Sequence, residues 1–245
     1  MFLSGTILNV VAVLIGATIG TVASARIPTR VGSSLTTGIG LFVTALSLSM
    51  ALTVFSDPTA RTGDALVVLG SILLGVVLGE GLRIHDRLAA LGRWFELRLA
   101  RPGGESRVAE AFVTASLVFC VGPLTILGSL QNGLTGDATL LATKSLLDGV
   151  ASVAFAAALG PGVFLAAGTV LVVQGLIAGG AFLVRDAFDP RTVLVLTATG
   201  GVILLGVALR LLELKDARVA NFLPALVVAP ILLRVADAIR TALGA

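Results

Sequence analysis

Charged residues are scarce in this chain of 245 residues, at 13% of the sequence, and tyrosine is absent. Soluble domains carry roughly a quarter charged residues, so this deficit excludes an ordinary soluble globular protein. Apolar residues make up 56% of the sequence. They lie in uncharged runs close to the length of about 20 residues that a helix needs to cross a bilayer. The sequence therefore predicts an all-α, polytopic helical membrane protein.

Cysteine and histidine occur once each, as Cys120 and His85. A single thiol within an apolar run excludes a disulfide framework and a metal site made of several cysteines. A single histidine likewise excludes a metal site made of several histidines. The chain also lacks a His-Glu-x-x-His motif and a phosphate-binding loop. We therefore predict that the protein is not an enzyme and binds no cofactor or metal cofactor. The net charge of +3 is explained by basic cytoplasmic loops rather than by nucleic-acid binding.

Eight apolar stretches are predicted as membrane segments of a single integral membrane domain, 1–245. The segments are 3–23, 35–55, 65–79, 111–130, 140–160, 163–184, 192–209 and 219–233. They divide the domain into a first helix triplet (1–79), a loop (80–107), a two-helix connector (108–160) and a second triplet (163–240).

The loop 80–107 contains six arginines. Because cytoplasmic loops are enriched in lysine and arginine, this loop is predicted to be cytoplasmic, with both termini on the other side of the membrane. Apolar residues recur at helical spacing from Ile84 to Leu99, which predicts an amphipathic helix on the inner membrane surface. Binding of a soluble partner is the alternative role for this segment.

The two triplets resemble each other in sequence. Residues 5–8 (GTIL) match residues 168–171 (GTVL), and the same register aligns Gly16 with Gly179. The predicted topology makes the triplets inverted copies, which is a recurrent feature of secondary transporters. Chance similarity between glycine-rich apolar helices is the alternative explanation.

Small residues one helical turn apart occur in several segments. The spacings are Gly16/Gly20, Gly75/Gly79 and Gly175/Gly179. Such spacings let helix backbones approach closely. They predict a tightly packed bundle and leave homo-oligomerisation open.

Polar side chains at membrane depth are the candidate site residues, because an ionisable group there costs several kcal/mol. Asp148 has apolar residues on both sides, and Lys144 lies one turn earlier on the same helix face. Asn9 and Gln174 lie on the first helices of the two triplets. Two interpretations remain open at this point. Lys144 and Asp148 form either a structural ion pair or part of a site that binds a proton or a cation.

A polar run, 131–137, separates the two connector helices. Non-helical backbone at membrane depth is tolerated only when it is buried in protein or lines a cavity. An ordinary loop on the outer side is the simpler prediction for this run.

Several separated motifs resemble the bacterial domain-of-unknown-function-554 (YqgA-like) membrane proteins. The motifs are residues 5–9 (GTILN), 119–122 (FCVG), 128–137 (GSLQNGLTGD), 144–149 (KSLLDG) and 219–226 (VANFLPAL). The resemblance covers nearly the whole chain. It implies a multi-pass protein of the bacterial cytoplasmic (inner) membrane with a transport role, and it assigns no functional residues.

Together these features predict a secondary transporter or channel for a small solute or ion. Its site would lie near the bilayer midplane and include Asp148, Lys144, Gln174 and Asn9. The alternative is a membrane scaffold or regulator that binds a partner through the loop 80–107. The lipid bilayer is the one partner that the composition itself implies.

Overall fold

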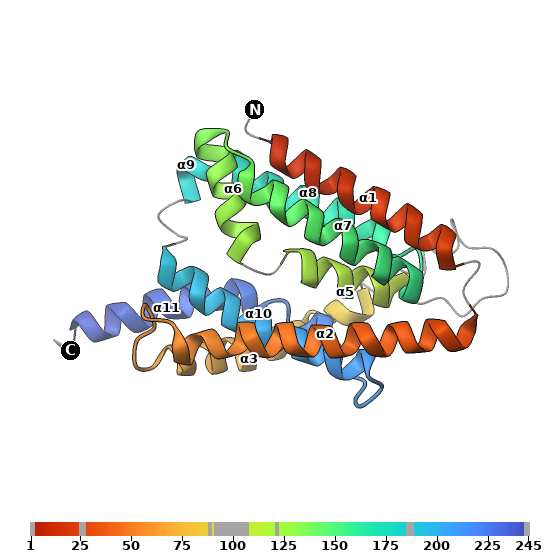
Figure 1. Cartoon of the computed structure of the whole chain (residues 1–245). Coiled ribbons are helices and arrows are strands. Elements are labelled where there is room, and N and C mark those ends of the chain that lie inside the picture. Colours follow the sequence, from red (N-terminus) through yellow and green to blue (C-terminus); the bar gives the residue numbers. More distant parts are fainter. Residues whose placement is uncertain are drawn as a thin grey trace. The chain divides into compact units, whose positions relative to one another are not determined.

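The computed structural model describes residues 3–24, 28–87, 90, 108–120, 123–184 and 189–242 (Figure 1). Within these ranges the secondary structure is helical and contains no strand, which confirms the predicted all-α class. The segment predicted as an amphipathic helix, 84–99, lies largely outside the described residues.

The helices follow the predicted membrane segments closely. They are α1 (Ser4–Ser24), α2 (Thr29–Ser56), α3 (Asp64–Gly81), α5 (Val108–Cys120), α6 (Pro123–Thr135), α7 (Thr139–Leu159), α8 (Val163–Gly179), α9 (Ala181–Val184), α10 (Pro190–Leu211), the 3₁₀ helix η2 (Val219–Phe222) and α11 (Ala225–Ala242). Among the described residues, 6 helices are long and apolar enough to cross a membrane, the bent pair α5–α6 is a seventh candidate, and α8 is a shorter apolar helix.

The connector differs from the prediction in two places. The segment predicted as one helix, 111–130, is divided into α5 and α6, whose axes differ by 61°. A proline in a helix interior removes a hydrogen bond and clashes with the preceding turn, whereas proline is favoured in the first turn of a helix, and α6 begins at Pro123. A Gly-Pro pair within the apolar run was therefore the signal for this break.

The prediction of a loop at 131–137 was wrong for residues 131–135, because α6 continues through Thr135, whereas residues 136 and 137 are not helical. The side chain of Asn132 is fully buried, and its Oδ1 accepts a hydrogen bond from the backbone N–H of Gly5 at 3.1 Å. The first N–H groups of a helix lack partners within that helix. Asn132 therefore satisfies one of these groups at the start of α1, which favours a helical, buried position over a solvated loop.

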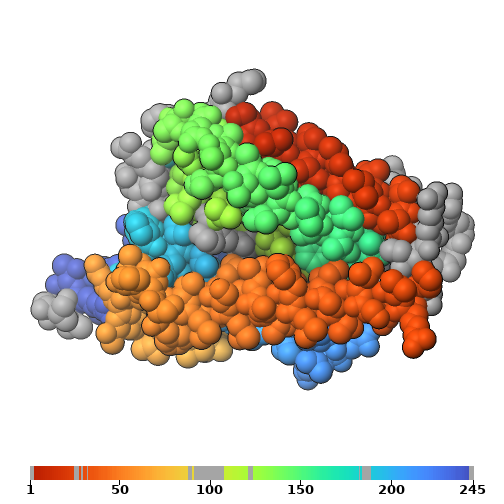
Figure 2. Space-filling model, in the orientation of Figure 1, coloured from red at the N-terminus to blue at the C-terminus, as the bar shows by residue number. Residues whose placement is uncertain are grey.

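The chain divides into two compact units, and the first comprises residues 1–42 and 87–185. Its closest helix pair is α1 with α7, which lie side by side in Figure 1 and whose surfaces touch in Figure 2. A Cβ atom on Gly16 would collide with the carbonyl of Gly149, and one on Gly20 would collide with the carbonyl of Val153. The predicted role of the Gly16/Gly20 spacing in close packing is confirmed.

Gly16→Ala should lower the melting temperature of the purified protein, because the added methyl group forces α1 away from α7. Gly175→Ala is the matched control, since Gly175 has open space around its Cα. At that helical position alanine is intrinsically favoured over glycine by about 1 kcal/mol. Thermal unfolding in detergent measures both changes, and equal effects of the two substitutions would contradict the proposed contact.

The second unit comprises residues 43–86 and 186–245. Within it α3 packs against α11 and η2, with Gly75 against the backbone of Ala225 and Gly79 against the carbonyl of Asn221. The helix α10 is the most buried candidate span, with 72% of its apolar window inside the protein. Its start is capped by Asp189, whose Oδ1 accepts the N–H of Thr192 at 2.9 Å, as acidic N-cap residues commonly do.

Each helix of the first triplet contacts its counterpart in the second triplet, and the pairs α1/α8 and α3/α11 run antiparallel. The start of α1 is bonded to the end of α6, which contacts the end of α8, so α1 and α8 run in opposite directions. Met50 and Ala51 of α2 contact Gly201 of α10. The pair α3 and α11 is the third, since Gly75 lies against the start of α11.

Candidate functional site

The candidate site is centred on an ion pair within the helix α7 of the first unit. The Lys144 Nζ atom lies 2.8 Å from Asp148 Oδ1 and 2.7 Å from Asp148 Oδ2. Both side chains are 7% exposed, and residues four apart share one helix face. The sequence prediction of a Lys144–Asp148 pair at membrane depth agrees with this geometry.

Asn9 on α1 joins the ion pair. Its Nδ2 donates a hydrogen bond to Asp148 Oδ2 at 2.9 Å. The glycine contact between Gly16 and Gly149 brings α1 close enough to α7 for this bond. Three of the four residues predicted from the sequence are therefore in direct contact.

Gln174 on α8, the fourth predicted residue, is fully buried in the same unit. Neither its Nε2 nor its Oε1 has a hydrogen-bond partner among the described residues. Five further buried oxygens in this unit share that condition: Thr6 Oγ1, Asn9 Oδ1, Thr21 Oγ1, Ser129 Oγ and Gln131 Oε1. Buried polar atoms in folded proteins are paired in about nine cases of ten, so this group requires an explanation.

Ser129 is fully buried on α6, which packs against α1. It precedes Asn132 by three residues and so lies on the same face of α6. Asn132 is bonded to the backbone of Gly5, and Asn9 lies one turn further along α1 from that contact.

Gln174 lies on α8, which also packs against α6. A Cβ atom on Gly133 would collide with the carbonyl of Ala178, so α6 and α8 touch there. Ser129 and Gln174 each precede that contact by one turn of their own helix. The unpaired atoms of Thr6, Asn9, Ser129 and Gln174, called the polar cluster below, therefore belong to three helices, α1, α6 and α8, that pack against one another.

The break between α5 and α6 lies beside α8, near the level of Gln174. The two helices α5 and α8 start side by side, because a Cβ atom on Gly162 would collide with the carbonyl of Val108. Cys120, the last residue of α5, and Gln174 each lie twelve residues further along, or about 18 Å of helix. Discontinuous helices near the midplane are typical of substrate sites in transporters.

Sequence reasoning missed Thr6, Ser129 and the helix break. Serine and threonine are common in membrane helices, where they often bond to their own backbone. Thr143, for example, donates to the Thr139 carbonyl at 3.2 Å. No sequence signal distinguishes such residues from Ser129, whereas the Gly-Pro pair at residues 122–123 did indicate the break.

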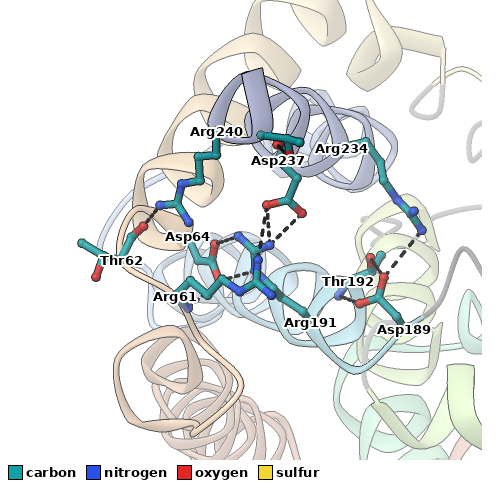
Figure 3. A network of polar contacts seen from close by, with 10 residues as sticks. Arg61, Thr62, Asp64, Asp189, Arg191, Thr192, Arg234, Asp237 and Arg240 are labelled. Carbon is teal, nitrogen blue, oxygen red and sulfur yellow. Dashed lines mark hydrogen bonds and ion pairs between the residues drawn. The ribbon is translucent and has the colours of Figure 1, made fainter. Parts of the chain in front are cut away.

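A second charged cluster joins three helices of the second unit (Figure 3). Arg191, at the start of α10, contacts Asp64 of α3 through two nitrogens at 2.9 and 2.5 Å. A third nitrogen of Arg191 lies 2.6 and 2.7 Å from the carboxylate oxygens of Asp237 on α11. The side chain of Asp64 is 1% exposed. This network was not predicted from the sequence.

The apolar helices and their buried polar groups define a polytopic α-helical membrane protein. Residues 4–234 match the family described as "Protein of unknown function (DUF554)", and the chain belongs to that family, as its motifs predicted.

Two relatives match nearly the full length of the chain. The "Uncharacterized membrane protein YdfK" of Bacillus subtilis (strain 168) is 29% identical over 234 residues, covering 96% of this chain and 97% of that protein. The "Uncharacterized protein YqgA" of Escherichia coli (strain K12) is 30% identical over 229 residues, covering 92% and 94%. No solved structure matches the chain.

Proposed function

We propose that this protein is a secondary transporter or channel for a small solute or ion, with its site at Asp148, Lys144, Asn9 and Gln174. The observation that carries this proposal is a buried ion pair, bonded to Asn9, together with unpaired buried polar atoms on the mutually contacting helices α1, α6 and α8 of the first unit. A charged pair inside the membrane costs several kcal/mol. An apolar helix contact would hold α7 in place without that cost, which favours a functional role.

The packing of the two triplets supports an inverted repeat. Inverted copies of a helix lie antiparallel when they meet across a pseudo-two-fold axis in the membrane plane. The aligned pairs α1/α8 and α3/α11 run antiparallel, and α2 contacts α10, which is consistent with this relation. Transporters with inverted repeats carry their sites near the midplane at the repeat interface.

The proposed location is the bacterial cytoplasmic membrane, with the loop 80–107 in the cytoplasm. Basic residues at the described start of this loop, Arg83 and Arg87, are consistent with that orientation. In the same orientation Arg191 and its partners lie at the outer ends of α3, α10 and α11, and the loop before α7 also faces outward.

Water should reach the polar cluster during a transport cycle. In a Cys120→Ala background, Ser129→Cys should react with a small charged thiol reagent in native membranes, because an opening site admits solvent. Ser71→Cys is the matched control, since Ser71 is buried on α3 and donates to the Val67 carbonyl at 2.6 Å. Mass spectrometry measures the modified fraction.

The same experiment distinguishes transport from the alternative function as a membrane scaffold. If Ser129→Cys stays as unreactive as the Ser71→Cys control, and proteoliposomes show no flux under imposed proton, alkali-ion or solute gradients, the transport proposal is wrong. Loss of flux in the Asp148→Asn variant, with flux in wild type, would tie transport to this site.

A further inference from the structure

The polar cluster is composed mainly of oxygen atoms. Four of its five unpaired atoms are oxygens, from Thr6, Asn9, Ser129 and Gln174, and one is the Gln174 Nε2. Leaving such atoms buried without partners is costly, and a bound ion or water is a common explanation for them. Neutral amide and hydroxyl oxygens suit hard cations, and rings of neutral oxygens replace the hydration shell of potassium in channels.

The charge of the site limits the ligand to one positive charge. Asp148 is the one carboxylate that the described residues bring to the cluster, and the Lys144 ammonium now balances it. An additional cation would leave the buried site with a net charge, which a low-dielectric interior disfavours. A monovalent cation that takes the place of the ammonium keeps the site neutral.

Lys144 has a route away from Asp148. It lies five residues into α7, or about 7.5 Å from the first helical residue, and a lysine stem can extend along apolar surface toward a helix end. Asp137 lies just beyond that end. Hydrogen bonds from the Thr139 hydroxyl and backbone N–H lower the pKa of Asp137, so this carboxylate is ionised and available to attract the released ammonium.

The side-chain amide of Asn9 can contact the site both when Lys144 occupies it and when a cation occupies it. It now donates its Nδ2 to Asp148 while its Oδ1 is unpaired. Rotation of the amide by a half turn exchanges the donor and the acceptor. The oxygen of Asn9 can then face a cation bound to Asp148.

Building on the transport function proposed above, we propose that the ligand is a monovalent alkali cation that exchanges with the Lys144 ammonium at Asp148. Oxygens of Asn9, Ser129 and Gln174 complete its shell, with Thr6 adjoining them. Lys144 thus acts as a built-in competitor that occupies the site when the ion is absent.

Thermal unfolding of the purified full-length protein tests this exchange. At equal ionic strength, sodium, potassium or lithium chloride should raise the melting temperature above its value in choline chloride, and the rise should saturate. A hundredfold excess over the dissociation constant should produce a shift on the order of 5 °C. Ser129→Ala and Gln174→Leu should raise the half-saturating concentration at least about tenfold, whereas the Ser71→Ala control should leave it unchanged.

Lys144→Met distinguishes exchange from simple ion binding. Without the competing ammonium, the half-saturating concentration should fall at least about tenfold. If this variant is unstable in choline chloride, the alkali ion should restore its folding. Equal melting temperatures in alkali and choline chloride for wild type and for Lys144→Met would overturn the proposal.

The outcomes separate this inference from the transport function. Ion-dependent stabilisation without flux would support the cation site and contradict transport. Flux of protons or of a neutral solute, with no alkali-ion effect on melting, would support transport and overturn the cation site.

Discussion

Asp148→Asn should abolish the proposed transport and lower the free energy of unfolding by up to about 3–5 kcal/mol, because it removes the counter-charge that holds the Lys144 ammonium in the buried site. The side chains of Lys144 and Asp148 are each 7% exposed, so water cannot replace the missing carboxylate. Flux in proteoliposomes and denaturant unfolding in detergent measure the two effects on the same preparation.

A double variant, Lys144→Met with Asp148→Leu, is the control that separates stability from function. Replacing a buried ion pair with apolar residues of similar size is often neutral or stabilising by about 1–4 kcal/mol. The double variant should therefore fold at least as well as Asp148→Asn and still fail to transport. Transport at the wild-type rate by the double variant would show that the pair is only structural.

Arg191→Met is expected to have the second-largest effect, a loss of about 3–5 kcal/mol in the free energy of unfolding. It leaves Asp64, whose side chain is 1% exposed, without its two guanidinium contacts. Asp237 also loses its contact with Arg191, but its side chain is 37% exposed, and Arg61 Nη1 lies 3.9 Å from its Oδ1. Adding Asp64→Leu to Arg191→Met should restore much of the loss, because no buried charge then remains.

Arg218→Met is the matched control for the Arg191 experiment. Arg218 lies 3.6 Å from Glu80, and the two side chains are 62% and 50% exposed. Exposed ion pairs contribute about 0–1 kcal/mol. Equal unfolding free energies for Arg191→Met and Arg218→Met would show that the Arg191 network does not hold α3, α10 and α11 together.

The sequence predicted the helices well because hydropathy alone places them. Uncharged runs of membrane length have few alternatives in a bilayer, where each backbone polar group needs a partner within the chain. The Lys144–Asp148 pair was predictable for a similar reason, since a four-residue spacing fixes a shared helix face whatever surrounds it.

The parts of the site that were not predicted from the sequence depend on how the helices face one another. Residue spacing in the sequence does not determine this. Gly16/Gly20 and Gly175/Gly179 are identical patterns, yet the first meets the α7 backbone and the second has open space. Likewise Ser129 is unpaired while Ser145 bonds to the Leu141 carbonyl at 2.7 Å. Only the packing of α1, α6 and α8 separates these cases.

The glycine contact between α1 and α7 has a mechanical consequence for the site. Backbones that meet at Gly16 and Gly149 have no side-chain layer between them, so we expect the two helices to move together and to carry Asn9 and Asp148 as one unit. Ser129 and Gln174 belong to α6 and α8. In the proposed transport cycle, the site would then open between the pair α1/α7 and the pair α6/α8, and each pair would keep part of the proposed ion's shell.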